Sequence, residues 1–423
     1  MAKVIRKHWQ SEASAGLPRA DRQSCEYEAY VPDPLVGRAI VLDGTVAADV
    51  ADAEAAITRL NLAARALVDT EALARLLLRA ESVASSKIEG LEVGPRRLLE
   101  AEALRALGQK SSDVTASAVL GNIEAMVYAV RSARSDEELT LEQLLEIHRR
   151  LLAGSRLEKS GGKIRSAQNW IGGSSYNPCS AAFVPPPPEL VHDLLVDLCR
   201  FCNDDALPAV VQAALAHAQF ETIHPFIDGN GRTGRALIHL ILRRRGLAAR
   251  VLPPVSLVLA TWATDYVAAL EGTRYRGRPA SAAAHEGLNR WVGLFATACR
   301  RAVDDASAFD ERVRGLEVTW RERLGAVRAD SATDLLLHVL PGAPVLTVRS
   351  AAALISRSLR ATNAAIARLS EAGVLTQVTV GRRNRTFEAR ELIDAFTDLE
   401  RQLASPTGDT RAAPPSRRVP RRR

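Results

Sequence analysis

Twelve residues near the middle of the chain combine side chains that can do chemistry together. The stretch HPFIDGNGRTGR, residues 224–235, holds a histidine, an aspartate, three glycines and two arginines. The imidazole of His224 has a usual pKa near ~6.5 and can accept a hydroxyl proton at neutral pH. The carboxylate of Asp228 suits Mg²⁺, which prefers one or two carboxylates together with substrate phosphates. A base beside a metal ligand predicts a reaction at a phosphate.

The elements on either side predict how these residues are held. The apolar segment AVVQAALAHAQFETI predicts a helix that ends near Ile223, and GRTGRALIHLILRRRG predicts a second helix that stops at Gly246. The first N–H groups of a helix have no partner inside it, and the helix dipole favours negative charge there. The start of the second helix is therefore a predicted anion site. Its cradle residues are Gly229, Asn230, Gly231, Arg232, Gly234 and Arg235.

The cradle residues would serve a phosphate in three ways. Glycines let a phosphate approach the main chain, and asparagine can donate to a phosphate or ribose oxygen. The planar guanidinium groups of the arginines can donate paired hydrogen bonds to phosphate oxygens. The alternative is a core histidine at a helix end with glycines that serve only the turn, which leaves the converging arginines and aspartate unexplained. Neither the Gly-Lys-Ser/Thr ending of a Walker loop nor the zinc motif H-E-x-x-H occurs in the sequence. We therefore expect transfer of a phosphorus-centred group to a hydroxyl.

Composition indicates a soluble, mainly helical protein. The chain has 423 residues, enough for two or three domains, and no run of about 18 apolar residues predicts a membrane span. Five of its seven net positive charges come from the tail after Ala404, so the folded part is close to neutral. The five cysteines are few and odd in number, which favours a reducing cytoplasm. Cys199 and Cys202 lie in a predicted helix and are expected to be partly buried core thiols rather than a redox or zinc pair.

Changes in composition and apolar periodicity along the chain predict a mainly α fold in five segments. They are a flexible arm over 1–27, a helical region over 28–110, a helical core over 111–311, a connecting helix and winged helix-turn-helix module over 312–404, and a disordered basic tail over 405–423. In the core, the runs NWI and AAFVP flank a Gly/Ser/Asn turn and predict a β-hairpin that ends at four prolines. The winged module rests on two helices, over 348–359 and 362–372, and two strands around the turn GRRNR.

The motif as a whole resembles a known family. HPFIDGNGRTGR matches the Fic-domain pattern H-P-F-x-D/E-G-N-G-R-x-x-R at every defined position. The preceding helix AHAQFETIHPF and the hairpin GKIRSAQNWIGG with AAFVPPPP are similar to the same family, as are YVAALEGTRYRGR, LNRWVGLF and YEAYVPDPL. Together these segments cover about residues 28–300. The resemblance implies a helical Fic core with a short hairpin, the flap.

That resemblance implies adenylyl transfer from ATP to a Tyr, Thr or Ser hydroxyl of a target protein, or of the chain itself, with release of pyrophosphate. His224 would deprotonate the hydroxyl, Asp228 would hold Mg²⁺ against the α- and β-phosphates, and Arg235 would meet the γ-phosphate. An extended target segment would pair with the flap by strand addition. The other implied ATP contacts are Gly229, Asn230, Gly231, Arg232, Thr233, Gly234 and Tyr266, and the implied flap residues are Ala182, Phe183 and Val184.

A short segment before the core carries a second resemblance. SSKIEGLEV ends a predicted helix, and on its own Glu89 would be a solvated glutamate in a last turn. Beside a Fic core, Ser85, Glu89 and Gly90 resemble the family's inhibitory helix, S/T-x-x-x-E-G/N. The resemblance implies that Glu89 pairs with Arg235 and blocks the γ-phosphate position, which gives an inhibited resting enzyme.

Two other functions stay open on the sequence. The first is a DNA-binding regulator whose Fic core senses nucleotide, because arginines surround the predicted winged module. They are Arg357, Arg360, Arg368, Arg382, Arg383 and Arg385. Its recognition helix has few base-reading side chains, so a partner protein and a second copy of the chain, in a homodimer, are alternative partners. The other function is removal of AMP, since the inhibitory glutamate can position water in some relatives.

Overall fold

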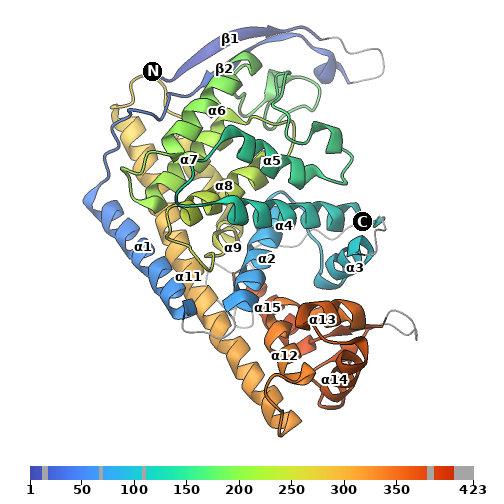
Figure 1. The fold of residues 1–423 in the computed structure, drawn as a ribbon. Helices are drawn as coiled ribbons and strands as arrows, with labels where there is room; N and C mark the ends of the chain where they lie inside the picture. The colour runs from blue at the N-terminus through green and yellow to red at the C-terminus, as the bar shows by residue number, and fades with distance from the viewer. Residues whose placement is uncertain (12–17, 66–69, 107–110, 379–384, 404–423) are drawn as a thin grey trace. The chain divides into compact units, whose positions relative to one another are not determined.

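The structure, a computed structural model, describes residues 1–11, 18–65, 70–106, 111–378 and 385–403. Over these residues it is mainly helical with two small antiparallel sheets, as the sequence predicts (Figure 1). The predicted disordered tail over 405–423 lies outside the described residues. No helix in the described part of the chain has the length and apolar character needed to cross a membrane.

The chain divides into two compact units. The first contains Met1–Ala55, Ser117–Leu247 and Ala263–Thr297, and the second contains Ala56–Ala116, Ala248–Trp262 and Ala298–Arg423. The predicted border between core and connecting helix, at 311/312, falls inside one continuous helix, α11 (Ala282–Leu324). The two compact units themselves divide inside this helix, between Thr297 and Ala298, so its continuity does not test the predicted border.

The first unit is built around two buried helices, α7 (Ala209–Ile223) and α8 (Asn230–Arg244). Every residue of α7 except Glu221 is buried, which is typical of a helix at the centre of a core. α5 (Leu141–Leu152) and α6 (Pro188–Cys202) pack beside this pair (Figure 1). The unit also contains α10 (Ala263–Gly272), most of α4 (Val114–Ser132) and the first parts of α1 (Gly44–Arg65) and α11.

Local sequence signals set the ends of these helices. Thr140 caps α5 and forms the predicted capping box with Gln143. α6 begins at Pro188, the last of the four prolines, because proline suits the first position of a helix. Cys199 and Cys202 on α6 are buried free thiols, which confirms the predicted burial.

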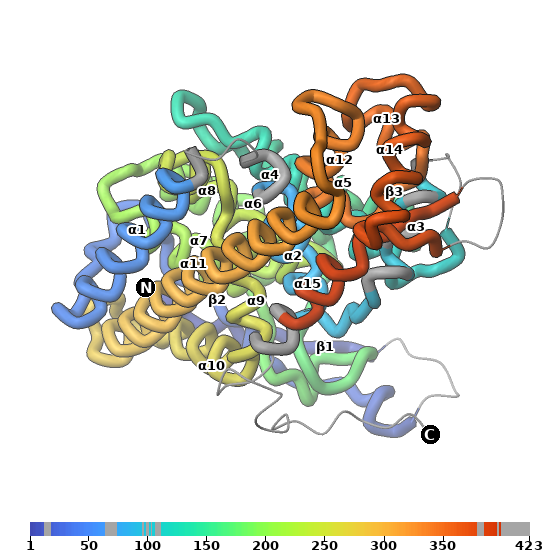
Figure 2. The backbone as a smooth tube through the Cα atoms, turned by 90° about the horizontal axis from the view of Figure 1, so that it is seen from below, coloured from blue at the N-terminus to red at the C-terminus, as the bar shows by residue number. Residues whose placement is uncertain are grey.

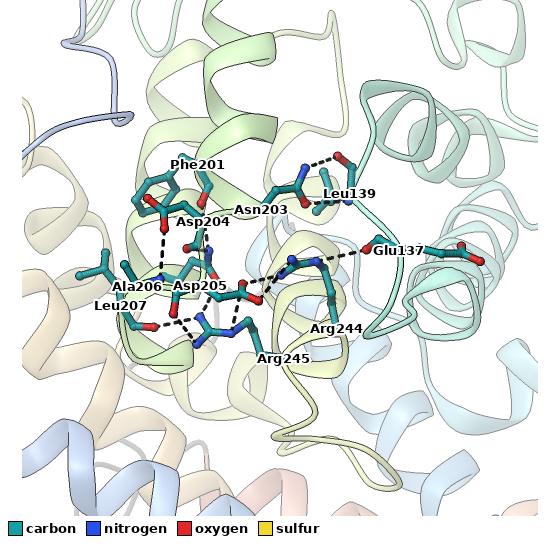
Figure 3. A network of polar contacts seen from close by, with 11 residues as sticks. Glu137, Leu139, Phe201, Asn203, Asp204, Asp205, Ala206, Leu207, Arg244 and Arg245 are labelled. Carbon is teal, nitrogen blue, oxygen red and sulfur yellow. Dashed lines mark hydrogen bonds and ion pairs between the residues drawn. The ribbon is translucent and has the colours of Figure 1, made fainter.

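The basic end of α8 is anchored within the first unit. Arg244 donates to the Asp205 carboxylate at 2.7 Å and to the Glu137 carbonyl oxygen at 3.3 Å, while Arg245 donates to the Leu207 carbonyl oxygen at 2.9 Å. Figure 3 shows both guanidinium groups reaching the loop that joins α6 to α7. These arginines therefore hold α8 in place rather than forming a basic surface.

The N-terminal segment corrects the prediction of a flexible arm over 1–27. β1 (Lys3–Trp9) and β2 (Cys25–Val31) pair antiparallel along their whole length. The ribbon lies beside the segment between α5 and α6 (Figures 1 and 2), where a disulfide joins Cys25 of β2 to Cys179. Because Cys25 and Cys179 are 154 residues apart, local sequence patterns could not indicate the contact.

We expect the Cys25–Cys179 disulfide to stabilise the first unit. Closing a loop of 154 residues lowers the entropy of the unfolded chain, an effect worth up to about 5 kcal/mol at this loop length. Reduction with dithiothreitol should therefore lower the thermal unfolding midpoint, measured by circular dichroism with and without the reductant. Cys25→Ser should show the lower midpoint under both conditions. A wild-type midpoint that does not respond to the reductant would contradict this expectation.

One buried carboxylate joins two helices of the second unit. This unit contains α2 (Thr70–Ile88), α3 (Pro95–Ala106) and α9 (Val255–Thr261). Glu81 of α2 is fully buried and accepts hydrogen bonds from the Ser256 main-chain N–H, at 2.7 Å, and from the Ser256 hydroxyl. A carboxylate at the start of a helix accepts hydrogen bonds from N–H groups that have no partner inside the helix, and its negative charge interacts favourably with the helix dipole. Glu81 therefore holds α9 against α2.

Over the described residues, the C-terminal part of the second unit has four α-helices and a three-stranded antiparallel sheet of order β3-β5-β4. Its elements are α12 (Ala332–Val339), β3 (Val345–Thr347), α13 (Val348–Ile355), α14 (Leu359–Glu371), β4 (Thr376–Gln377), β5 (Thr386–Glu388) and α15 (Arg390–Leu403). The two predicted helices are present with shifted ends. The first stops at Ile355 because Ser356 is left-handed, and the second starts at Leu359 because Ser358 caps it. Arg382 and Arg383 of the predicted wing lie outside the described residues.

Candidate active site

The predicted chemical motif forms the connection between α7 and α8. The helix boundaries predicted around it are confirmed, since α7 ends at Ile223 and α8 begins at Asn230. His224 caps α7 in the left-handed conformation, with φ 49° and ψ 60°. The Asp228 side chain in the following turn is 50% exposed, so a ligand can reach it. The structure therefore brings the predicted base, the predicted metal ligand and the predicted anion site into one turn.

Two glycines allow this turn to pack tightly. Gly229 caps α8 with φ 78°, and a β-carbon there would lie 2.7 Å from Leu151 of α5. At Gly234 a β-carbon would lie 2.6 Å from the Glu221 carboxylate and 3.0 Å from Nδ1 of His217, both on α7. A β-carbon at either position would force these neighbouring side chains to move, and the positive φ of Gly229 adds backbone strain, so glycine suits both positions.

Polar side chains of the motif brace the turn. Asp228 accepts a hydrogen bond from Arg232 at 3.1 Å. The buried Asn230 side chain accepts from the Phe226 N–H at 2.8 Å and donates to the Phe226 carbonyl oxygen at 2.9 Å. These two bonds fix the Asn230 amide in the turn, and its part in an anion cradle stays a prediction. Arg232 and Arg235 are buried cations, 5% and 1% exposed.

His148 of α5 is a site residue that sequence analysis missed. Its ring stacks on Phe226, with the ring centroids 3.6 Å apart. Its Nδ1 accepts a hydrogen bond from the Gly162 N–H at 3.0 Å, so the ring proton lies on Nε2, which donates to the Asp228 carbonyl oxygen at 3.0 Å. Burial lowers the pKa of His148 to about 4, which keeps the ring neutral at neutral pH. Its sequence signal was a histidine inside the buried stripe Leu144, Ile147 and Leu151.

A second buried histidine supports the motif from α7. Nε2 of His217 lies 2.7 Å from the Tyr266 hydroxyl, which binds α10 to α7. Burial, together with the nearby Arg235 cation, lowers the pKa of His217 to about 3. Tyr266 is only 3% exposed, and its implied contact with ATP stays a prediction.

The predicted flap hairpin contains one β-bridge, between Ile171 and Phe183. The hairpin that the runs NWI and AAFVP predicted is therefore present as this single bridge, and η3 (Pro178–Ser180), a 3-10 turn, lies in the connection between its two sides. The three implied flap residues differ in burial. Ala182 is exposed, Phe183 is half-buried and Val184 is buried.

The N-terminal ribbon holds the flap from one side. The Tyr30 N–H of β2 donates to the Val184 carbonyl oxygen at 2.9 Å, and Trp9 of β1 packs edge-to-face on Trp170. The Arg274 guanidinium lies over the Phe183 ring, 3.7 Å from its centroid. One edge of the flap is therefore already occupied by β2.

The implied inhibitory residues lie at the end of α2, in the second unit. α2 ends at Ile88, next to the predicted stop at Gly90, which has φ 77°. Ser85 is buried, and Glu89 is exposed. The pairing of Glu89 with Arg235 stays a prediction.

The motif fits a metal ion that is held mainly by a nucleotide. Within the described ranges, no group of three or more His, Cys, Asp and Glu side chains can hold a metal ion by itself. Asp228 offers one half-exposed carboxylate close to the start of α8. Mg²⁺ commonly takes one such carboxylate and completes its shell with phosphate oxygens and water.

Two family models match the chain. Residues 138–242 match the Fic/DOC family, and residues 47–131 match the Fic/DOC family N-terminal model. The first match contains α5, α6, α7 and most of α8, and with them the whole connection from His224 to Arg235. Both matches support a Fic protein.

Similar curated proteins are adenylyltransferases by name. The "Protein adenylyltransferase fic-1" of Caenorhabditis briggsae is 31% identical over 175 residues, 41% of this chain and 32% of that protein. The "Protein adenylyltransferase Fic" of Drosophila grimshawi is 38% identical over 138 residues, 32% of this chain and 26% of that protein. The chain thus spans about a third or less of these relatives. These names support a Fic-type adenylyltransferase.

A solved structure supports the fold. The crystal structure of a Fic family protein from Desulfovibrio desulfuricans G20 covers 82% of this chain and 97% of its own, with a TM-score of 0.50 and 21% sequence identity. At that identity the likeness concerns the fold alone.

Proposed function

We propose that the chain is a protein adenylyltransferase that moves AMP from ATP to a side-chain hydroxyl of a target protein. The observation that carries the proposal is the single turn between α7 and α8, where His224, Asp228 and the start of α8 follow one another. The names of the similar curated proteins support the same activity.

The order of groups in the turn suggests the course of the reaction. The phosphates of ATP lie against the N–H groups that begin α8, and Arg232 and Arg235 balance their charge. His224 accepts the proton of the target hydroxyl, whose oxygen attacks the α-phosphorus. The bond from the α-phosphorus to the oxygen that bridges to the β-phosphate breaks, and pyrophosphate leaves. Mg²⁺, held by Asp228 and the phosphates, would neutralise part of the phosphate charge.

The target segment is proposed to add as a strand to the flap. The Val184 carbonyl oxygen is bonded to β2 through Tyr30, so we place the incoming strand beside Trp170–Gly172, on the other side of the Ile171–Phe183 bridge. Pairing through main-chain groups would align the target hydroxyl while reading little of its sequence.

We also propose that the resting enzyme is autoinhibited. Glu89 directly follows the last residue of α2, at the place that the inhibitory-helix pattern gives to its glutamate. Its proposed partner is Arg235, the residue that would otherwise meet the γ-phosphate. ATP would then bind with its phosphates in an unproductive arrangement.

Position-specific labels test the activity. Protein incubated with ATP that is labelled on the α-phosphate should incorporate the label, whereas ATP labelled on the γ-phosphate should release the label as pyrophosphate. Label transferred from the γ-position would indicate a kinase and contradict the proposal. Incubation with an adenylylated target would detect the reverse activity, removal of AMP.

The C-terminal module is proposed to be a winged helix-turn-helix, because its element order and its β3-β5-β4 sheet fit that plan. A protein partner, including a second copy of the chain, suits it better than DNA. Arg368 is bonded to the carbonyl oxygens of Leu324 and Ala326, at 3.1 and 2.7 Å, so it is already used inside the module. The exposed residues Ala364 and Ala367 of α14 offer no groups that read bases.

The small and odd number of cysteines favours a cytoplasmic location. The Cys25–Cys179 disulfide, which the sequence did not predict, weighs against that location, because such a bond needs an oxidising setting in order to form.

A further inference from the structure

The catalytic histidine of the proposed reaction sits in an unfavourable backbone conformation. His224 is one of three residues other than glycine with positive φ among the described residues. The left-handed region costs a residue with a β-carbon roughly 1–2 kcal/mol. Its N–H is used by α7, since it donates to the Phe220 carbonyl oxygen at 2.9 Å. Other contacts must therefore stabilise the turn and set the direction of the imidazole.

Arg165 supplies most of these contacts from the segment before the flap. Its Nε donates to the His224 carbonyl oxygen at 2.9 Å, and its main-chain N–H donates to the Pro225 carbonyl oxygen at 2.9 Å. Its Nη2 donates to the Pro186 carbonyl oxygen at 2.5 Å and reaches that of Ile223 at 3.4 Å. The guanidinium thus gathers main-chain oxygens at the C-terminal end of α7, where the helix dipole favours a cation.

Burial makes this arrangement specific to arginine. Arg165 is only 3% exposed, and burial lowers its pKa to about 10, so it remains a cation at neutral pH. A buried cation is costly unless its donors are satisfied. The planar guanidinium can satisfy several carbonyl oxygens at once, whereas a lysine ammonium at the same place would reach fewer of them.

Asn169 also donates a hydrogen bond to the His224 carbonyl oxygen. Its Nδ2 donates to the His224 carbonyl oxygen at 3.3 Å and to the Phe226 carbonyl oxygen at 3.0 Å. Asn169 directly precedes Trp170 and Ile171, the first side of the flap. One side chain therefore connects the flap to the main chain of the catalytic turn.

We propose that Arg165 and Asn169 are positioning residues that hold the His224 carbonyl oxygen and thereby aim the imidazole of the base. The inference rests on the proposed adenylyl transfer. Because Asn169 belongs to the flap, a target strand added beside Trp170 is placed in register with the side chain that fixes the base. Binding of the target strand and alignment of the His224 imidazole then occur together.

Kinetics in a Glu89→Gly parent test the proposal. Arg165→Lys and Asn169→Ala should each lower kcat for AMP transfer by about 10- to 100-fold, because a displacement near 1 Å can cost that much. The dissociation constant for ATP, measured by calorimetry, should change less than threefold, since the start of α8 is untouched. Ser166→Ala, an exposed neighbour, is the matched control and should behave as the parent. Unchanged kcat in Asn169→Ala, or ATP affinity that falls as far as kcat, would overturn the proposal.

A measurement without turnover separates this inference from the proposed function. In protein with ¹⁵N-labelled histidine, the His224 ring signals can be assigned by their absence in His224→Ala. They should shift in Asn169→Ala and stay in place in Ser166→Ala. A parent that binds ATP but transfers no AMP would refute the proposed function, and the ring signals would still decide the positioning role. Identical His224 signals in Asn169→Ala and the parent would refute that role.

Discussion

Glu89→Gly is expected to raise the rate of self-adenylylation by about 10- to 100-fold, the size of a coupling free energy of roughly 1–3 kcal/mol. The proposed reason is the release of Arg235 for the γ-phosphate, so that ATP binds with its α-phosphorus open to attack. Glu89 is exposed and follows the last residue of α2, so the change should leave the thermal unfolding midpoint within a degree or two of wild type, about 0.5 kcal/mol or less. Incorporation of α-labelled AMP over time measures the rate.

Glu92→Gly provides the matched control for this effect. Glu92 is also an exposed carboxylate, three residues further along the chain, and its loss should not change the rate. Equal labelling of wild type and Glu89→Gly would show that the enzyme is not restrained by Glu89. Equal stimulation by both glycine variants would trace the effect to a loosened chain and would also reject the proposed ion pair.

His224→Ala in the Glu89→Gly background is expected to lower AMP transfer by about 10²- to 10⁴-fold, the usual contribution of a general base. The phosphates are proposed to bind at the start of α8 rather than to the imidazole, so the affinity for ATP should remain within a fewfold of the parent. Single-turnover labelling measures the transfer, and calorimetry measures the binding.

An exposed histidine on α6, His192, serves as the control for that loss. His192→Ala should label at the parental rate. If His224→Ala labelled as fast as the parent, the base would have to be another group and the proposed roles in the motif would be wrong. A parallel loss of ATP binding would instead assign His224 to the nucleotide site.

Much of the helical core could be predicted because its signals are local. The apolar period around the motif predicted α7 and α8 to within a residue of their inner ends, and Thr140 and Gln143 form the expected capping box. The end of a helix depends on a few neighbouring residues, so the local sequence is enough to predict it. The same holds for the end of α2 before Gly90.

Parts of the fold that depend on distant partners could not be predicted in the same way. The ribbon of β1 and β2 is stabilised by a flap that lies more than a hundred residues further along, so its own sequence resembled a loose arm. Arg165 and His148 serve the site through bonds to main-chain oxygens of other segments. Such bonds need only a donor at the right place, and no spacing in the sequence reveals them.

The disulfide between β2 and the flap also has a consequence for how the chain is made. At usual synthesis rates, 154 residues separate the emergence of Cys25 from that of Cys179 by on the order of 10 to 30 s. Of the five cysteines in this sequence, only Cys25 has emerged during that interval, because Cys179 is the next one. Among these five, the first thiol that Cys25 can meet is therefore its native partner, and Cys199, Cys202 and Cys299 emerge only later. The order of translation itself protects the pairing.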